Sequence, residues 1–122
     1  MRPKTLAEVA RLARAGDSFD RCLANFLDEF YAAPAASALV ETPPVLAPSR
    51  GELGPVQDAY LAATAEELAR QYNLTLPAWT LAEERKLHRP WFASSLAALL
   101  LESPAGFRAR NLFVSENALS RV

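Results

Sequence analysis

The chain has 122 residues and a formal net charge of −1, with 51% hydrophobic and 22% charged residues. This length and balance fit one globular domain, residues 1–122, and exclude general disorder and a coiled-coil rod. With one Cys and one His, the chain has too few ligands for a four-ligand structural zinc site and cannot form an intrachain disulfide.

The choice of apolar residues favours helices. Isoleucine is absent, and Ala and Leu dominate the apolar stretches. β-Branched residues are preferred in strands, whereas Ala and Leu lose least on entering a helix. The sequence therefore predicts an all-α fold: a single compact bundle of about five to six helices, with short C-terminal helices.

Two helices are predicted in the first third of the chain. Thr5 and Glu8 form a capping box that opens a helix over residues 6–15, and Gly16 ends it. Ser18 caps the next helix. Its apolar positions repeat with the period of a helix from residue 19 to residue 30, so this helix is predicted to be the centre of the core. The thiol of Cys22 lies on this apolar stripe and is predicted to be buried. These positions are Phe19, Cys22, Leu23, Phe26, Leu27 and Phe30.

A Pro-rich connecting segment follows at residues 33–54, between the second and third helices. It holds four of the nine prolines, and Pro55 follows it directly; a long helix cannot accommodate so many. A short helix can still follow Pro34, over residues 35–40. The rest is predicted to be an ordered or semi-ordered loop, or a segment that a partner grips.

The third helix is predicted from Pro55 to Tyr72, followed by a connector to Trp79. A second Thr-x-x-Glu capping box at Thr80 predicts a short helix to His88. Further elements are expected beyond it: an apolar helix over residues 96–102, a helix from 103 or 104 to 110, an extended stretch at 112–114 and a last turn over 115–120. So apolar a helix as 96–102 is buried in the fold or under a partner.

The sequence gives no signal for a membrane segment. The longest apolar stretch, residues 91–101, is well short of the roughly 20 residues that span a bilayer. Charged side chains interrupt the N-terminal region where a signal peptide would be apolar. We therefore expect a cytoplasmic protein.

Catalytic chemistry is not predicted. The single imidazole, His88, has Lys86 and Arg89 as neighbours, which lower its proton affinity. Paired carboxylates on the predicted helices are adjacent in sequence, so they diverge by about 100°. The four glycines are too scattered for a phosphate-binding loop. We expect no enzyme activity, no metal and no cofactor.

The candidate functional residues lie late in the chain and combine aromatic and basic side chains. Trp and Arg are enriched at interface hot spots, but the residues alone leave open whether Trp79, Trp91 and Phe92 are core or interface. The candidate partner-binding set is Trp79, Arg89, Trp91, Phe92, Arg108, Arg110 and Phe113. DNA binding is not favoured, because residues 17–73 carry a net charge of −6 and the chain shows no helix-turn-helix spacing.

Several segments together resemble a known group of proteins. The segments are Asp17 to Arg21, Phe26 to Tyr31, Asp58 to Leu61, Pro77 to Trp79, Arg89 to Phe92 and Ser103 to Ser115. They resemble small helical bacterial antitoxin-like proteins encoded beside abortive-infection-type nucleotidyltransferase toxins. The resemblance implies a protein that binds its toxin and prevents nucleotide transfer onto tRNA, with no catalytic residue of its own.

On this resemblance, residues 74–114 are expected to contact the toxin, with help from the acidic second and third helices. Two alternatives remain: a dimeric DNA-binding transcriptional regulator, and a homo-oligomeric structural module without another partner. A steep salt dependence of DNA binding would distinguish the regulator.

Overall fold

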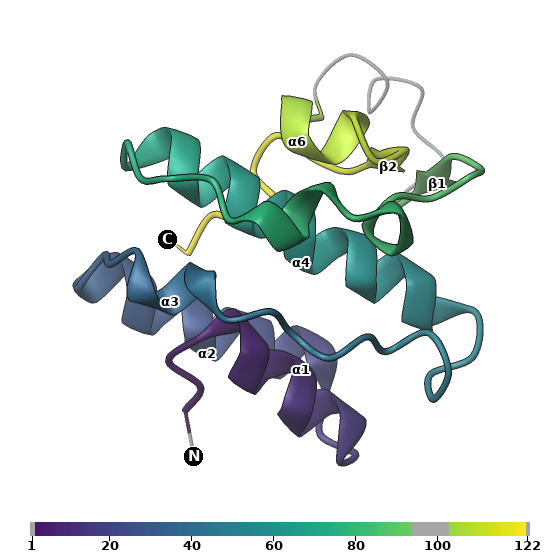
Figure 1. Ribbon diagram of the computed structural model, residues 1–122, viewed down its shortest axis with the longest axis horizontal. Coiled ribbons are helices and arrows are strands. Elements are labelled where there is room, and N and C mark those ends of the chain that lie inside the picture. The colour runs from purple at the N-terminus through teal and green to yellow at the C-terminus, as the bar shows by residue number, and fades with distance from the viewer. Residues whose placement is uncertain (1, 94–102, 122) are drawn as a thin grey trace.

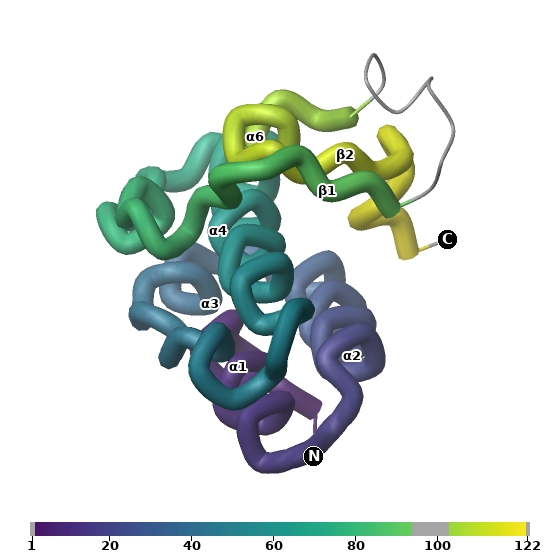
Figure 2. The backbone as a smooth tube through the Cα atoms, turned by 90° about the vertical axis from the view of Figure 1, so that its right-hand side faces the viewer, coloured from purple at the N-terminus to yellow at the C-terminus, as the bar shows by residue number. Residues whose placement is uncertain are grey.

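One long helix, α4 (Leu53–Gln71), runs through the middle of the protein (Figure 1). This computed structural model describes residues 2–93 and 103–121. The chain before α4 forms a layer of three helices on one side of it, and the chain after α4 folds back over the other side (Figure 2). The first layer consists of α1 (Leu6–Arg14), α2 (Phe19–Ala32) and α3 (Ser37–Val40).

The second layer is built from short elements. It consists of the 3₁₀ turns η1 (Ala78–Leu81) and η2 (Glu83–Arg85), strand β1 (Trp91–Phe92), helix α6 (Ala105–Arg108) and strand β2 (Leu112–Phe113). Because both layers pack on α4, this helix is buried on both of its sides. Leu61 and Leu68 join the core under α1 and α2, whereas Ala59 and Ala63 join a smaller core with Phe107.

The first two helices begin where the sequence predicts. The N–H of Glu8 donates to Oγ1 of Thr5 at 3.0 Å, and the N–H of Arg21 donates to Oγ of Ser18 at 3.2 Å. Gly16 takes a φ of 117°, which L side chains rarely adopt. The first helix ends at Arg14, one residue before the predicted end.

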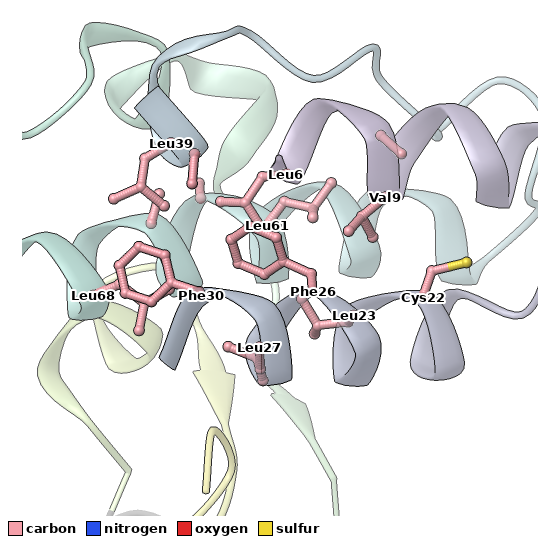
Figure 3. Close-up of a cluster of buried hydrophobic side chains, with 14 of the residues drawn as sticks. Leu6, Val9, Cys22, Leu23, Phe26, Leu27, Phe30, Leu39, Leu61 and Leu68 are labelled. Carbon is pink, nitrogen blue, oxygen red and sulfur yellow. The ribbon is translucent and has the colours of Figure 1, made fainter. Parts of the chain in front are cut away.

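The stripe of α2 is the centre of the larger core, as predicted. All six of its apolar positions are buried and belong to one cluster with Leu6 and Val9 of α1 and Leu61 of α4. Figure 3 shows this cluster, with the stripe labelled from Cys22 to Phe30. Cys22 is one of the six and has 5% of its surface exposed. Burial raises the pKa of its thiol.

We expect Cys22 to react slowly with a disulfide reagent at pH 8 in the native protein, and rapidly in denaturing urea. The thiolate is the reacting form, and burial both disfavours it and blocks access. The measurement is the rate of thionitrobenzoate release. A matched control carries Cys22→Ser with Ala32→Cys, because Ala32 lies exposed on the same helix. Equal native rates for the two proteins would show that α2 does not shield its thiol.

Helix α4 starts earlier than predicted, so Pro55 is its third residue. In the first turn the missing proline N–H removes no helical hydrogen bond. The helix ends at Gln71, and Asn73, two residues later, takes a φ of 55°. The N–H of Leu74 then donates to the carbonyl of Ala69 at 2.7 Å, so this end has a Schellman motif.

The Pro-rich segment contains the predicted short helix, α3, and then a loop held against α4. The carboxylate of Asp58 accepts hydrogen bonds from the N–H groups of Leu46 at 2.6 Å and Ala47 at 3.0 Å. Gly54, one turn earlier on α4, permits this approach, because a Cβ there would lie 2.6 Å from Cα of Ala47. The loop is therefore part of the packed structure.

The prediction was wrong over residues 80–88, where the structure has two 3₁₀ turns separated by the extended residue Ala82. The hydroxyl of Thr80 does not cap a helix and instead donates to the carbonyl of Pro77 at 2.7 Å. Arg85, in the second turn, points inward and is 2% exposed, and its guanidinium donates to the carbonyl of Pro43.

The all-α prediction also missed a two-stranded parallel sheet, in which Trp91 pairs with Leu112 and Phe92 with Phe113. The extended stretch predicted at 112–114 is confirmed as the second strand. Helix α6 is shorter than predicted, and the predicted helix 96–102 lies outside the described residues. The fold is thus mostly helical, with five α-helices in the described ranges.

The C-terminal residues return to α2. The hydroxyl of Tyr31 donates to the carbonyl of Leu119 at 2.9 Å, and Nε of Arg121 lies 2.9 Å from Oδ1 of Asp28. These contacts connect the two layers at one end of the molecule. Among the described helices, none is long and apolar enough to span a bilayer.

Candidate protein-binding surface

The structure separates the seven candidate residues into two groups. Trp79 and Arg110 are buried, at 9% and 5% exposure. The other five remain at least partly accessible: Arg89, Phe92 and Arg108 are exposed, and Trp91 and Phe113 are half-buried.

Trp79 belongs to the core. Its Nε1 donates to the carbonyl of Leu39 at 2.9 Å, so the indole connects the second layer to α3. The guanidinium of Arg85 lies 5.0 Å from the centroid of the Trp79 ring, within reach of a cation–π interaction. Trp79 is therefore unavailable to a partner.

Arg110 is also occupied within the chain. Its Nη1 donates to Oε1 of Glu66 at 2.7 Å and to the carbonyl of Gly106 at 2.8 Å, and its Nη2 donates to the carbonyl of Thr80 at 2.9 Å. Glu67, next to Glu66, accepts from the N–H of Gly106 at 2.7 Å. This network fastens α6 to α4, so Arg110 has a structural role.

Phe92 and Phe113 form a stacked pair on the outer face of the small sheet. Their ring centroids are 4.8 Å apart and the rings are 19° from parallel. Side chains alternate across a strand, so the paired residues before them, Trp91 and Leu112, face the smaller core, which both contact. Phe92 remains 41% exposed. Backbone pairing thus holds the two aromatic rings in register, with Phe92 exposed and Phe113 half-buried.

Basic side chains accompany this pair on the same two segments. The segments run side by side, because the N–H of Leu87 donates to the carbonyl of Arg110 at 3.2 Å and that of Trp91 to the carbonyl of Asn111 at 2.8 Å. Within the described ranges, three exposed cations on them make no ion pair. We call this set the aromatic-basic surface; it comprises Phe92, Phe113, Lys86, Arg89 and Arg108.

The acidic middle of the chain is largely neutralised internally. Six of the nine acidic residues between 17 and 73 lie within 4.0 Å of an Arg nitrogen. They are Asp28, Glu29, Glu41, Asp58, Glu66 and Glu67. The acidic second and third predicted helices therefore present less unpaired charge to a partner than their composition suggests.

A cleft of about 610 Å³ lies between α2, the start of α4 and the C-terminal segment. Leu23 and Tyr60 are among its apolar lining, and its charged lining residues in the described chain are Asp20 and Arg121. Burial, followed by the nearby charge of Asp20, raises the pKa of Tyr60 to about 12. The phenol is therefore neutral at physiological pH and is not a general base.

The described residues bring no other reactive groups together. His88 is exposed and does not line the cleft. No group of three or more His, Cys, Asp or Glu side chains in the described ranges could hold a metal ion. The aromatic-basic surface is thus the feature that chemistry singles out.

This chain matched no family model, no curated protein and no solved structure. The functional argument therefore rests on the surface itself and on the sequence resemblance.

Four of the five residues of the aromatic-basic surface were in the candidate set, and Lys86 was not. The sequence does contain a signal for it, because residues 86–101 include no Asp or Glu and the basic charges there lack acidic neighbours. Exposed apolar residues outside the surface were not predicted at all: Leu81 is 71% exposed and Val40 is 61% exposed. Single exposed apolar residues are ordinary in soluble proteins, so we assign them no role.

Proposed function

We propose that this protein is antitoxin-like: it binds a nucleotidyltransferase toxin by protein–protein contact and so neutralises it. The observation that carries the binding role is the stacked pair of Phe92, which is exposed, and Phe113, which is half-buried. The resemblance of segments including Arg89 to Phe92 and Ser103 to Ser115 supports the class of partner.

The physical reason is that a fold has no need to display two aromatic rings together. Aromatic and Arg side chains are enriched in protein interfaces, and a few of them carry most of the binding energy. The same strands direct Trp91 and Leu112 into the smaller core. One face of the sheet therefore packs on the smaller core, and the other face binds the partner.

In this role the protein contributes contacts and no bond-making step. A bound partner covers Phe92 and Phe113 and excludes water from them. The toxin is neutralised when that contact covers the surface it uses for tRNA. The buried residues Trp79 and Arg110 stabilise the fold and do not touch the partner.

The test is co-expression with the nucleotidyltransferase encoded beside the gene, followed by size-exclusion chromatography and a toxin growth assay. We expect co-elution and rescue of growth. Phe92→Ser should weaken binding by about tenfold or more, since it removes an interface aromatic. Val40→Ser is the matched control, because Val40 is exposed on α3 in the other layer.

Thermal denaturation of both variants checks that the fold is retained. Separate elution of wild-type protein and toxin at micromolar concentration would refute the proposed function. Equal binding by the Phe92→Ser and Val40→Ser variants would move the interface away from the aromatic-basic surface.

A further inference from the structure

The described charged residues on the two segments that carry the stacked rings are all basic. The described residues between 86 and 113 contain no Asp or Glu, and Glu102 lies outside them. Lys86, Arg89 and Arg108 are exposed and make no ion pair with any described residue. Elsewhere, most acidic groups of the middle of the chain are already paired with Arg, as at Asp28 and Glu41.

We propose that the aromatic-basic surface receives a carboxylate-rich segment of the partner protein. An apolar side chain of that segment packs on the rings of Phe92 and Phe113, and its carboxylates pair with the guanidinium groups of Arg89 and Arg108. This proposal rests on the proposed function and specifies the chemistry of the toxin element that docks here.

The identity of the cations supports a carboxylate partner. The planar guanidinium group binds a carboxylate through two parallel hydrogen bonds, which an ammonium group does not do. Two of the three unpaired cations, Arg89 and Arg108, are Arg. Charge complementarity of this kind also steers association and rejects partners of like charge.

The stacked geometry argues against single-stranded nucleic acid at this site. Proteins that bind single-stranded nucleic acid stack its bases on aromatic side chains and bind its phosphates along a basic groove. Here each ring covers one face of the other, with centroids 4.8 Å apart, so a base cannot enter between them. The three unpaired cations of this surface, in a chain of net charge −1, also supply few phosphate contacts.

The experiment uses three defined probes with the full-length protein. They are a synthetic 15-residue peptide in which Glu alternates with Leu and Phe, the same peptide with Lys in place of Glu, and a 15-nucleotide oligothymidylate. Binding is followed by Trp fluorescence, since Trp91 is half-buried beside the surface, and by amide chemical shifts of residues 86–93 and 103–113.

We expect the Glu peptide to shift these amides and the Lys peptide and oligothymidylate to leave them unchanged. Added salt should weaken the binding of the Glu peptide, because interactions between exposed charges are screened over about 10 Å at an ionic strength of 0.1 M. The double variant Arg89→Glu with Arg108→Glu should lower its affinity by at least about tenfold. Arg14→Glu with Arg21→Glu is the matched control, since both positions are exposed on the other layer.

Failure of the Glu peptide to shift these amides, or equal binding of the Lys peptide, would overturn the proposal. Oligothymidylate shifting the same amides would assign the surface to nucleic acid instead. The two proposals fail separately. A toxin that co-elutes equally well with the Arg89→Glu, Arg108→Glu variant refutes the carboxylate segment and leaves the antitoxin role standing. A toxin that never co-elutes, beside a Glu peptide that binds, refutes only the antitoxin role.

Discussion

Asp58→Ala is expected to lower the free energy of unfolding by about 3–5 kcal/mol, the cost of breaking a buried ion pair from one side. The substitution leaves the N–H groups of Leu46 and Ala47 without their acceptor and removes the carboxylate that faces Arg85. Urea unfolding at pH 7, followed by Trp fluorescence, measures the loss. A native protein typically has a free energy of unfolding of about 5–15 kcal/mol, so this loss would leave the folded protein only marginally stable.

The geometry assigns the larger share of this loss to the loop. The closest approach of the ion pair, from Nη1 of Arg85 to Oδ1 of Asp58, is 3.8 Å, too long for a hydrogen bond. The two backbone N–H bonds to Asp58 are 2.6 and 3.0 Å long. Asp58→Ala should therefore free the loop from α4 first, and amide exchange should rise at Leu46 and Ala47 before it rises in α2.

The pH dependence of this effect has a definite sign. Burial raises the pKa of Asp58 and outweighs the lowering by its two backbone bonds and Arg85. Between the unfolded pKa, about 3.9, and the raised folded pKa, the folded state binds more protons than the unfolded state. The contribution of Asp58 to the free energy of unfolding therefore falls as pH rises through this window. The difference in free energy of unfolding between wild type and Asp58→Ala should shrink over the same range.

Asp20→Ala is the control, because Asp20 is an exposed Asp whose side chain makes no ion pair with the described residues. Surface substitutions of this kind change stability by about 0.5 kcal/mol or less. If Asp58→Ala costs no more than Asp20→Ala, the loop is held by other contacts and the buried pair does not organise this side of α4.

The features that the sequence predicted correctly are local ones. A hydroxyl at Thr5 or Ser18 caps the helix that starts beside it, and the period of the α2 stripe is a property of one helix. The burial of Cys22 follows from the same period. These inferences need no knowledge of what lies across the core.

The features that it missed depend on residues far apart in the chain. Arg85 is buried beside the carboxylate of Asp58 on α4 and the carbonyl of Pro43, and residues 80–88 do not form the helix that the Thr80 capping box predicts. The pairing of β1 with β2 likewise requires residues 91 and 112 to meet. Capping signals and periodicity do not contain that information.

The same limit applies to the candidate site. Arg108 and Arg110 are the same residue type two positions apart, yet Arg110 is buried against Glu66 of α4 and Arg108 is exposed. Trp79 and Phe92 differ in the same way, since one meets the carbonyl of Leu39 and the other lies on the outer face of a strand. Residue type alone selected these candidates, and only packing separates the buried ones from those that remain accessible.

Phe26→Ala is expected to destabilise the protein by about 3–5 kcal/mol, the usual cost of removing a fully buried aromatic ring. Phe26 is 0% exposed, and Figure 3 places it in the centre of the larger core, near Leu6 and Leu61. Its ring lies 5.9 Å from that of Phe30. The neighbouring side chains cannot move far enough to fill the space left by the ring, so a cavity remains. Unfolding should therefore begin at a much lower urea concentration than in the wild type.

Phe92→Ala provides the comparison that bears on function, because it removes the same side chain from a site that is 41% exposed. We expect a cost of about 1 kcal/mol or less, most of it from the lost stacking on Phe113. A small cost here, beside a large one at Phe26, means that the fold does not need the Phe92 ring. A loss as large as that of Phe26→Ala would make Phe92 a core residue and remove the observation on which the binding role depends.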